Sequence, residues 1–237
     1  MKASDYIAQV IGGYCPFVVQ GGAAVHMIDS LARGGHRYVC CAHEQAAGFA
    51  ADGYAKIQGF GVAVTTCGPG ATNLLTAAAS AYFEGVPVLY LVGQQHGFQE
   101  LDVVGMFQCV TRFARQVTDP SRLKADLHDA ISAALLRRGP ALLNIFDEVY
   151  HSEIAAGNEF LFDIARFGRY VPPSDEAIFA KKRAPLPDQD WPADGSVNPY
   201  HFMRELGHQP CVLVTDIGNH GVWVKQSTNR PVIADNA

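Results

Sequence analysis

The stretch HEQAAGFAADGYA, residues 43–55, places a carboxylate, Glu44, ahead of a run of alanines and glycines. An acid in the first turn of a helix often does no more than complement the helix dipole. Here the acid directly follows an apolar run, RYVCCA (37–42), and the small residues after it let another backbone approach closely. We therefore expect an enclosed carboxylate. Enclosure disfavours the charged form and lets the carboxyl share a proton with a ring nitrogen.

A glycine-rich turn, CGPGATN (67–73), comes before a second run of small residues. A turn of this kind that opens a helix can hold an anion against the helix N-terminus. Its spacing, G-x-G-x-x-N, matches neither the dinucleotide fingerprint nor the P-loop, which needs Lys followed by Ser or Thr. The spacing alone leaves a binding loop and an ordinary structural turn equally open.

Two further segments carry polar side chains directly after apolar runs. HGFQELD (96–102) could contact a substrate through its loop, although its aromatic residue could equally serve simple packing. TDIGNHGVW (215–223) offers backbone amides and short polar side chains that suit a diphosphate, with an ordinary glycine turn as the alternative.

Short apolar runs that alternate with helical stretches must position these residues. The runs that predict strands are 16–20, 37–42, 61–66, 87–93 and 139–146. An amphipathic helix is predicted over 121–138, with Leu123, Leu127, Ile131 and Leu135 on one face. Strands that are apolar throughout and followed by helices indicate a parallel sheet covered on both faces. Residues 1–150 are thus predicted to form one doubly wound α/β domain of the α/β class.

Ligands of such a domain bind outside the carboxyl ends of the strands. Glu44, residues 68–73 and Gln94 are all predicted at those ends. Residues 151–199 are rich in X-Pro pairs, which favours a linker or an extended segment. Residues 200–237 are predicted to hold the first strand and turn of a second, incomplete α/β domain.

The composition excludes several classes of protein. The chain is 49% hydrophobic and 17% charged with a net charge of -5, which is typical of a globular protein without a nucleic-acid or membrane surface. The opening residues contain no apolar signal core, so we expect a cytoplasmic protein. The six cysteines form no C-x-x-C pair and are expected to be buried, reduced thiols. Cys40, Cys41 and His43 are too crowded for zinc, and no metal site is expected in this chain.

Residues 43–94 strongly resemble the pyrimidine-binding domain of thiamine-diphosphate enzymes, above all the acetolactate synthase (acetohydroxyacid synthase) group. The pair Gly21-Gly22, FQE at 98–100 and TRF at 111–113 follow the order found in that group. TDIGNHGVW resembles the first strand and turn of the family's diphosphate-binding domain.

The resemblance implies a role for each candidate residue. Glu44 would hydrogen-bond the ring nitrogen N1′ of the cofactor's aminopyrimidine, a proton exchange that activates the thiazolium carbon. The reaction implied is decarboxylation of a 2-oxo acid followed by bond formation with a second carbonyl. Phe98 and Gln99 would face the substrate channel. The cofactor-binding residues implied are Gly21, Gly22, Pro69, Gly70, Asn73, Gln94, Asp216, Gly218, Asn219 and His220.

The sequence departs from the family pattern at several points. It contains neither the GDG nor the NN of the Mg-diphosphate motif, so Mg²⁺ is expected to be ligated by a partner chain. The resemblance covers about residues 3–150 and resumes at about residue 197, which leaves too few residues between for the central domain that carries FAD in acetolactate synthases, so FAD is not expected. Gln20 and Arg112 replace the usual Pro and Lys, which bears on substrate preference.

The preferred interpretation is the pyrimidine-binding subunit of a split thiamine-diphosphate-dependent carboligase. It would act on a small 2-oxo acid within a homo- or hetero-oligomer, with a partner chain carrying GDG…NN. A 2-oxo-acid decarboxylase subunit, a non-catalytic truncated relative and an unrelated α/β binding protein are the alternatives.

Overall fold

The computed structural model describes residues 1–155, 213–216 and 232–235. The chain separates into two compact units, residues 1–171 and 172–237, and each is described by itself. No helix in the described residues is long and apolar enough to cross a membrane.

The first unit is built on a six-stranded sheet in which every pairing is parallel, in the order β2-β1-β3-β4-β6-β5. The strands are β1 Phe17–Val18, β2 Val39–Cys40, β3 Gly61–Thr65, β4 Val88–Gln94, β5 Phe113–Val117 and β6 Ala141–Phe146. Strands β3, β4 and β6 are buried at every position, as expected for strands covered on both faces.

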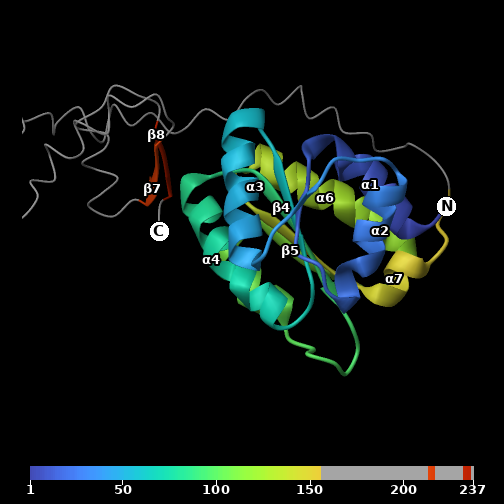
Figure 1. Cartoon of the computed structure of the whole chain (residues 1–237). Coiled ribbons are helices and arrows are strands. Elements are labelled where there is room, and N and C mark those ends of the chain that lie inside the picture. Colours follow the sequence, from blue (N-terminus) through green and yellow to red (C-terminus); the bar gives the residue numbers. More distant parts are fainter. Residues whose placement is uncertain (156–212, 217–231, 236–237) are drawn as a thin grey trace, which may run out of the picture. The chain divides into compact units, whose positions relative to one another are not determined.

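Helices cover both faces of this sheet, which confirms the predicted doubly wound α/β fold (Figure 1). One face carries α1 Ala3–Ile11, α2 Val25–Arg33, α6 Leu123–Leu136 and α7 Asp147–His151, and the other carries α3 Glu44–Gln58, α4 Pro69–Glu84 and α5 Val103–Phe107. Short 3₁₀ turns are η1 Gly12–Tyr14, η2 Gly22–Ala24, η3 Gln108–Val110 and η4 Pro120–Arg122. The side chains of β4 alternate between the faces: Leu89 and Leu91 join one core, and Tyr90 joins the other.

The small residues of α3 allow close packing against α4. A side chain at Gly48 would place its Cβ 2.5 Å from the Cβ of Ala77 and 2.9 Å from Cδ1 of Leu74. Further along α3, Lys56 extends its ammonium to within 2.7 Å of carboxylates on both Asp52 and Glu84. Close contact and this enclosed ion cluster hold the two helices together.

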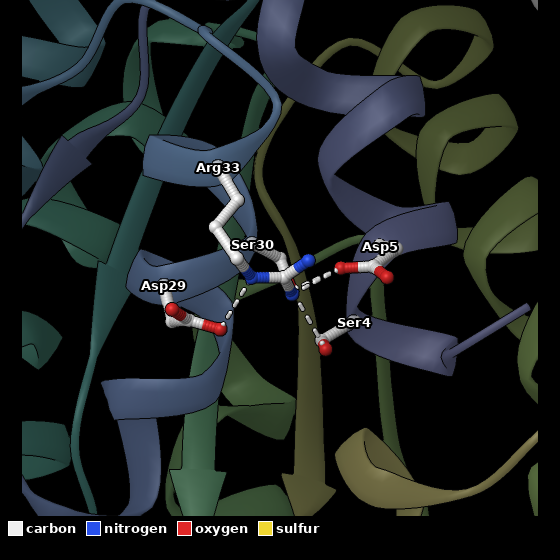
Figure 2. Close-up of polar contacts among 5 residues, drawn as sticks. All are labelled: Ser4, Asp5, Asp29, Ser30 and Arg33. Carbon is white, nitrogen blue, oxygen red and sulfur yellow. Dashed lines mark hydrogen bonds and ion pairs between the residues drawn. The ribbon is translucent and has the colours of Figure 1, made fainter.

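A polar cluster joins α1 to α2 on the opposite face (Figure 2). The hydroxyl of Ser30 lies 2.8 Å from that of Ser4 and donates to the Asp5 carboxylate at 2.7 Å. Arg33 contacts Asp5 at 2.7 Å and Asp29 at 2.9 Å. The cluster fixes how these two short helices meet over the sheet.

Two elements of this unit were not predicted. Strand β5 contains Arg115 and Gln116 and is partly exposed at the edge of the sheet, so it lacks the apolar run that marks the other strands. Helix α7 lies between the last predicted strand, 139–146, and the predicted linker, 151–199, and overlaps that linker only at His151. The chain stays attached beyond it, since Ile154 accepts a hydrogen bond from the N-terminal ammonium at 3.0 Å.

The prediction that the cysteines are buried is wrong for several of them. Cys67 is buried, but Cys40 and Cys109 are exposed, and Cys15 and Cys41 are half-buried. Cys40 lies in β2, a short strand at the sheet edge whose residues are both exposed. An apolar run in the sequence does not distinguish an edge strand from a central one.

In the second unit the structure describes two parallel strands, β7 Leu213–Asp216 and β8 Val232–Asp235. Strand β7 lies in the run where the sequence predicts a strand, and Asp216 ends it. Gly218, Asn219 and His220 lie outside the described residues.

Candidate functional site

The candidate residues of the first unit gather at one edge of the sheet, where the parallel strands end. Glu44 follows β2, Gly21 and Gly22 follow β1, and the turn at 67–70 follows β3. Gln94 is the last residue of β4. This edge is the one at which ligands bind in open parallel sheets.

Glu44 lies in the first turn of α3 but does not cap it. The N-cap is His43, whose ring Nδ1 accepts the backbone N–H of Gln45 at 3.1 Å. The Glu44 carboxylate, which is half-buried, instead reaches α4, where its Oε2 accepts a hydrogen bond from Nδ2 of Asn73 at 2.9 Å. A side-chain bond between two helices orients this carboxylate, in addition to any interaction with the helix dipole.

The glycine turn leaves room beside that carboxylate. A Cβ at Gly70 would lie 3.5 Å from Oε1 of Glu44 and 2.9 Å from Cγ2 of Thr66. Gly68 has φ 59° and ψ -120°, a conformation that side chains other than hydrogen rarely allow, and Pro69 opens α4 in its first turn. The turn therefore sets the start of α4 and keeps the space next to Oε1 free of side-chain atoms from position 70.

The FQE loop lies against the same turn. The thiol of Cys67 donates to the carbonyl of Phe98 at 3.8 Å. A Cβ at Gly68 would come within 2.6 Å of Cβ of Gln99, which itself has a positive φ of 49°. Phe98 is 61% exposed, so it remains available to a ligand or a neighbouring chain at this edge.

Gln94 differs from the other candidate residues because its side chain is buried and bonded within the protein. Its side chain is buried and donates from Nε2 to the carbonyl of Leu101 at 3.0 Å. Within the protein, this amide anchors the far end of the loop that carries Phe98 and Gln99. Its position at a strand end predicts proximity to the site but not this contact.

Gly21 is closely packed by its neighbours, whereas Gly22 is not. A Cβ at Gly21 would lie 2.5 Å from the Cβ of Thr66, so the loop after β1 packs directly on the end of β3. At Gly22 a Cβ would meet only the amide of Gln95, at 3.6 Å. The backbone therefore approaches Thr66 closely at Gly21, and there is more free space around Gly22.

The structure adds residues that the sequence analysis did not single out. Gln95 donates to the Asp147 carboxylate at 3.0 Å, and Nε2 of His96 lies 3.1 Å from the Glu148 carboxylate. The ring of His96 also lies 4.2 Å from that of Phe146. Strands β4 and β6 are neighbours in the sheet. The polar residues that directly follow each of these two strands could have indicated in the sequence that their side chains meet.

Within the part of the chain that the structure describes, no group of three His, Cys, Asp or Glu side chains could hold a metal ion.

Comparison with known proteins fits this geometry. Residues 1–113 match the family described as thiamine pyrophosphate enzyme, N-terminal TPP binding domain. Residues 1–113 are an N-terminal TPP-binding domain of the thiamine pyrophosphate enzyme family. The resemblance found in the sequence is thereby confirmed, and Glu44, the glycine turn and Asn73 all lie inside the matched residues.

Relatives of this thiamine pyrophosphate enzyme domain bear acetolactate synthase names. The probable acetolactate synthase large subunit of Methanocaldococcus jannaschii is 36% identical over 166 residues, which are 65% of this chain and 28% of that protein. The acetolactate synthase large subunit of Corynebacterium glutamicum is 38% identical over 148 residues, 58% of this chain and 24% of that one. The probable sulfoacetaldehyde acetyltransferase of Rhizobium meliloti is 34% identical over 147 residues, 59% and 25% of the two chains. The chain thus spans about a quarter of the length of the curated relatives it matches.

Proposed function

We propose that this chain supplies the pyrimidine-binding half of an acetolactate synthase-like carboligase. The reaction would decarboxylate a 2-oxo acid and join the remaining fragment to a second carbonyl compound. The observation that carries the proposal is the Glu44 carboxylate, held by Asn73 at 2.9 Å beside the space left by Gly70. Relatives named acetolactate synthase support the same reaction class.

The residues present fit the pyrimidine end of thiamine diphosphate. The Asn73 bond to Oε2 fixes the carboxylate, while Oε1 borders the space that a side chain at Gly70 would enter. Glu44 would use Oε1 to exchange a proton with a ring nitrogen of the cofactor. Bound thiamine diphosphate supplies the electron sink that makes loss of carbon dioxide from a 2-oxo acid feasible.

The residues around Glu44 have supporting roles in this proposal. Gly70 gives the pyrimidine ring access to the carboxylate, and Pro69 positions the first turn of α4. Phe98, exposed on a loop that rests on the glycine turn, would contact the substrate and exclude water from it. Gln94 would act by holding that loop in place rather than by touching the cofactor.

The diphosphate end of the cofactor needs a second component. We propose that it is bound with Mg²⁺ by residues of a GDG…NN type, on a partner chain or on a longer form of this chain. Asp216, Gly218, Asn219 and His220 would contribute the first turn of that half. The working enzyme would then be a homo- or hetero-oligomer. Glu44 and the residues that ligate Mg²⁺ would belong to different domains.

The test starts from the chain purified from its own source with everything that accompanies it. Native mass spectrometry would identify any stoichiometric partner, and the preparation would be assayed with 2-oxo acids, thiamine diphosphate and Mg²⁺ for acyloin products. We expect carbon dioxide release coupled to formation of a new carbon–carbon bond. Carbon dioxide release without such a bond would indicate a simple decarboxylase. A preparation that neither binds the cofactor nor turns over any 2-oxo acid would overturn the proposal.

A further inference from the structure

Three arginines gather at the opposite edge of the sheet, where strands β5 and β6 begin. Arg112 directly precedes β5, and Arg137 and Arg138 directly follow α6. Arg112 therefore lies at the end of the strands away from Glu44, where the expectation that it bears on substrate preference gains no support from its position. Arg137 and Arg138 are exposed and Arg112 is half-buried. Within the residues that the structure describes, none of the three forms an ion pair with a carboxylate. The cluster is therefore a local excess of positive charge on a chain whose net charge is -5.

The guanidinium of Arg112 is held in place by its surroundings. Its Nε donates to the carbonyl of Arg138 at 3.0 Å, and its Cζ lies 4.1 Å from the ring centroid of Tyr82. A Cβ at Gly139 would come within 2.7 Å of that Nε, so the glycine makes the space in which the side chain lies. A guanidinium fixed in this way loses little conformational freedom when it binds a carboxylate.

An exposed aromatic side chain lies next to Tyr82, whose ring packs on Arg112. Phe83, at the end of α4, is 73% exposed, and its ring lies 5.8 Å from that of Tyr82. Gly85, two residues further on, brings this turn to the arginines, because a Cβ there would lie 3.6 Å from Cβ of Arg138. Glu84 does not neutralise the cluster, since its carboxylate is buried and bound by Lys56.

A simpler explanation accounts for only part of this arrangement. Cations at the C-terminus of α6 are favourable to the helix dipole, which suffices for Arg137 and Arg138. It does not account for Arg112, which enters from another segment, or for an exposed phenylalanine beside it. Arginine together with aromatic residues is the composition typical of protein-binding surfaces.

We infer that Arg112, Arg137, Arg138 and Phe83 form a docking surface for an acidic segment of a partner polypeptide that also carries aromatic side chains. Carboxylates of the partner would pair with the guanidinium groups, and its aromatic rings would pack on Phe83. Charge complementarity selects this occupant, because an apolar segment would leave three guanidinium groups without counter-charges. The surface is at the end of the strands away from Glu44, so it can be occupied without blocking the candidate active site.

The experiment measures binding of a labelled glutamate–tyrosine copolymer to the full chain by fluorescence anisotropy, at low and high salt. The variant is Arg137→Gln/Arg138→Gln, and the matched control is Arg37→Gln/Arg122→Gln, which removes the same charge from other exposed positions. We expect the first variant to weaken binding about tenfold or more and the control to change it little, because charge-assisted hydrogen bonds are lost only at the docking surface. Phe83→Ser should weaken binding of the copolymer but not of poly-glutamate.

Three outcomes would overturn the inference. The first is no measurable binding at low salt, and the second is an equal loss in both double variants, which would reflect bulk charge alone. The third is tighter binding of inorganic phosphate or duplex DNA that the Arg137→Gln/Arg138→Gln variant abolishes, which would make the cluster a phosphate site. Circular dichroism of each variant checks that the fold is retained.

Discussion

At the scale of single residues, the proposal depends on a proton at Glu44. Glu44→Gln keeps the shape of the side chain and an oxygen that can accept from Asn73, but removes the titratable group. We expect activity of the complete enzyme to fall by about 10²–10⁴-fold, the usual contribution of general acid–base catalysis, with an unchanged unfolding temperature. Asp129→Asn, an exposed carboxylate on α6 outside the candidate site, is the control. Activity of Glu44→Gln within a few-fold of wild type would contradict the assignment.

The Asp5 carboxyl, which links α1 to α2, should make the free energy of unfolding depend on pH in the acid range. Burial opposes ionisation of its carboxyl, but the hydrogen bonds from Ser30 and Arg33 and the charge of Arg33 hold its pKa below 3.8. The pKa of Asp5 in the folded protein lies below its pKa in the unfolded chain. The stabilisation by the ionised carboxylate is therefore fully present at pH values above 3.8, and it is lost as the pH falls through the pKa of the folded protein. Asp5→Asn should therefore unfold more easily at neutral pH and lose less stability on acidification. Chemical denaturation at several pH values measures this, and parallel curves for both proteins would contradict it.

Much of the residue-level picture could be anticipated from sequence and part of it could not. The placement of Glu44 and Gly70 at the carboxyl ends of the strands was foreseen because each closely follows an apolar run, although Glu44 is half-buried rather than enclosed. The use of His43 as N-cap and of Gln94 as a loop anchor was not foreseen. Both depend on side-chain directions that only the folded backbone sets.

At the scale of helices and strands, two glycines of α3 form a matched pair for testing the α3–α4 contact. Gly48→Ala would force its Cβ to within 2.5 Å of Ala77, and overpacking of this kind costs about 1–3 kcal/mol. A Cβ at Gly53 would meet nothing within 4 Å, so Gly53→Ala should be neutral or stabilise the helix by up to about 1 kcal/mol. Urea denaturation of both variants checks the difference. Equal stabilities would show that α3 and α4 can move apart without cost.

The ion cluster further along the same helices predicts a larger effect. Burial opposes the charge on Lys56, but Asp52 and Glu84 outweigh it and raise the pKa of the ammonium above 10.5. Lys56→Met would leave two enclosed carboxylates without their cation, a change that typically costs about 3–5 kcal/mol. We expect a large fall in the urea midpoint, partly relieved by lowering the pH so that a carboxyl is protonated. Lys56→Arg, which keeps the charge, should recover much of the loss.

The elements themselves were predictable where burial is complete. Strands β3, β4 and β6 are buried throughout and were found from their apolar runs. Strand β5 was missed because an edge strand needs no apolar pattern, and α7 because its five residues are too few for a helical period to show. The structures of these two segments depend on contacts with residues distant in the sequence, which local patterns do not show.

At the scale of the whole molecule, the two ends of the parallel strands carry different chemistry. One end gathers Glu44, the glycine turn and the FQE loop, and the other gathers the arginines of the inferred docking surface. The chain spans about a quarter of the length of its relatives, and the function proposed above assigns the diphosphate half of the active site to further residues. A partner held at the arginine edge could remain bound while the Glu44 edge meets those residues.

The chain by itself should have a low affinity for thiamine diphosphate. In the proposed function the described residues hold the pyrimidine ring, and they contain no group of three His, Cys, Asp or Glu side chains that could hold a metal ion. The diphosphate normally contributes through charge-assisted bonds and a metal, so the chain alone should bind thiamine diphosphate weakly and with little effect of Mg²⁺. Calorimetric titration with thiamine diphosphate and with thiamine, each with and without Mg²⁺, should give similar weak affinities. Tight binding that requires Mg²⁺ would place the diphosphate site within residues 1–237 and would remove the need for a second component.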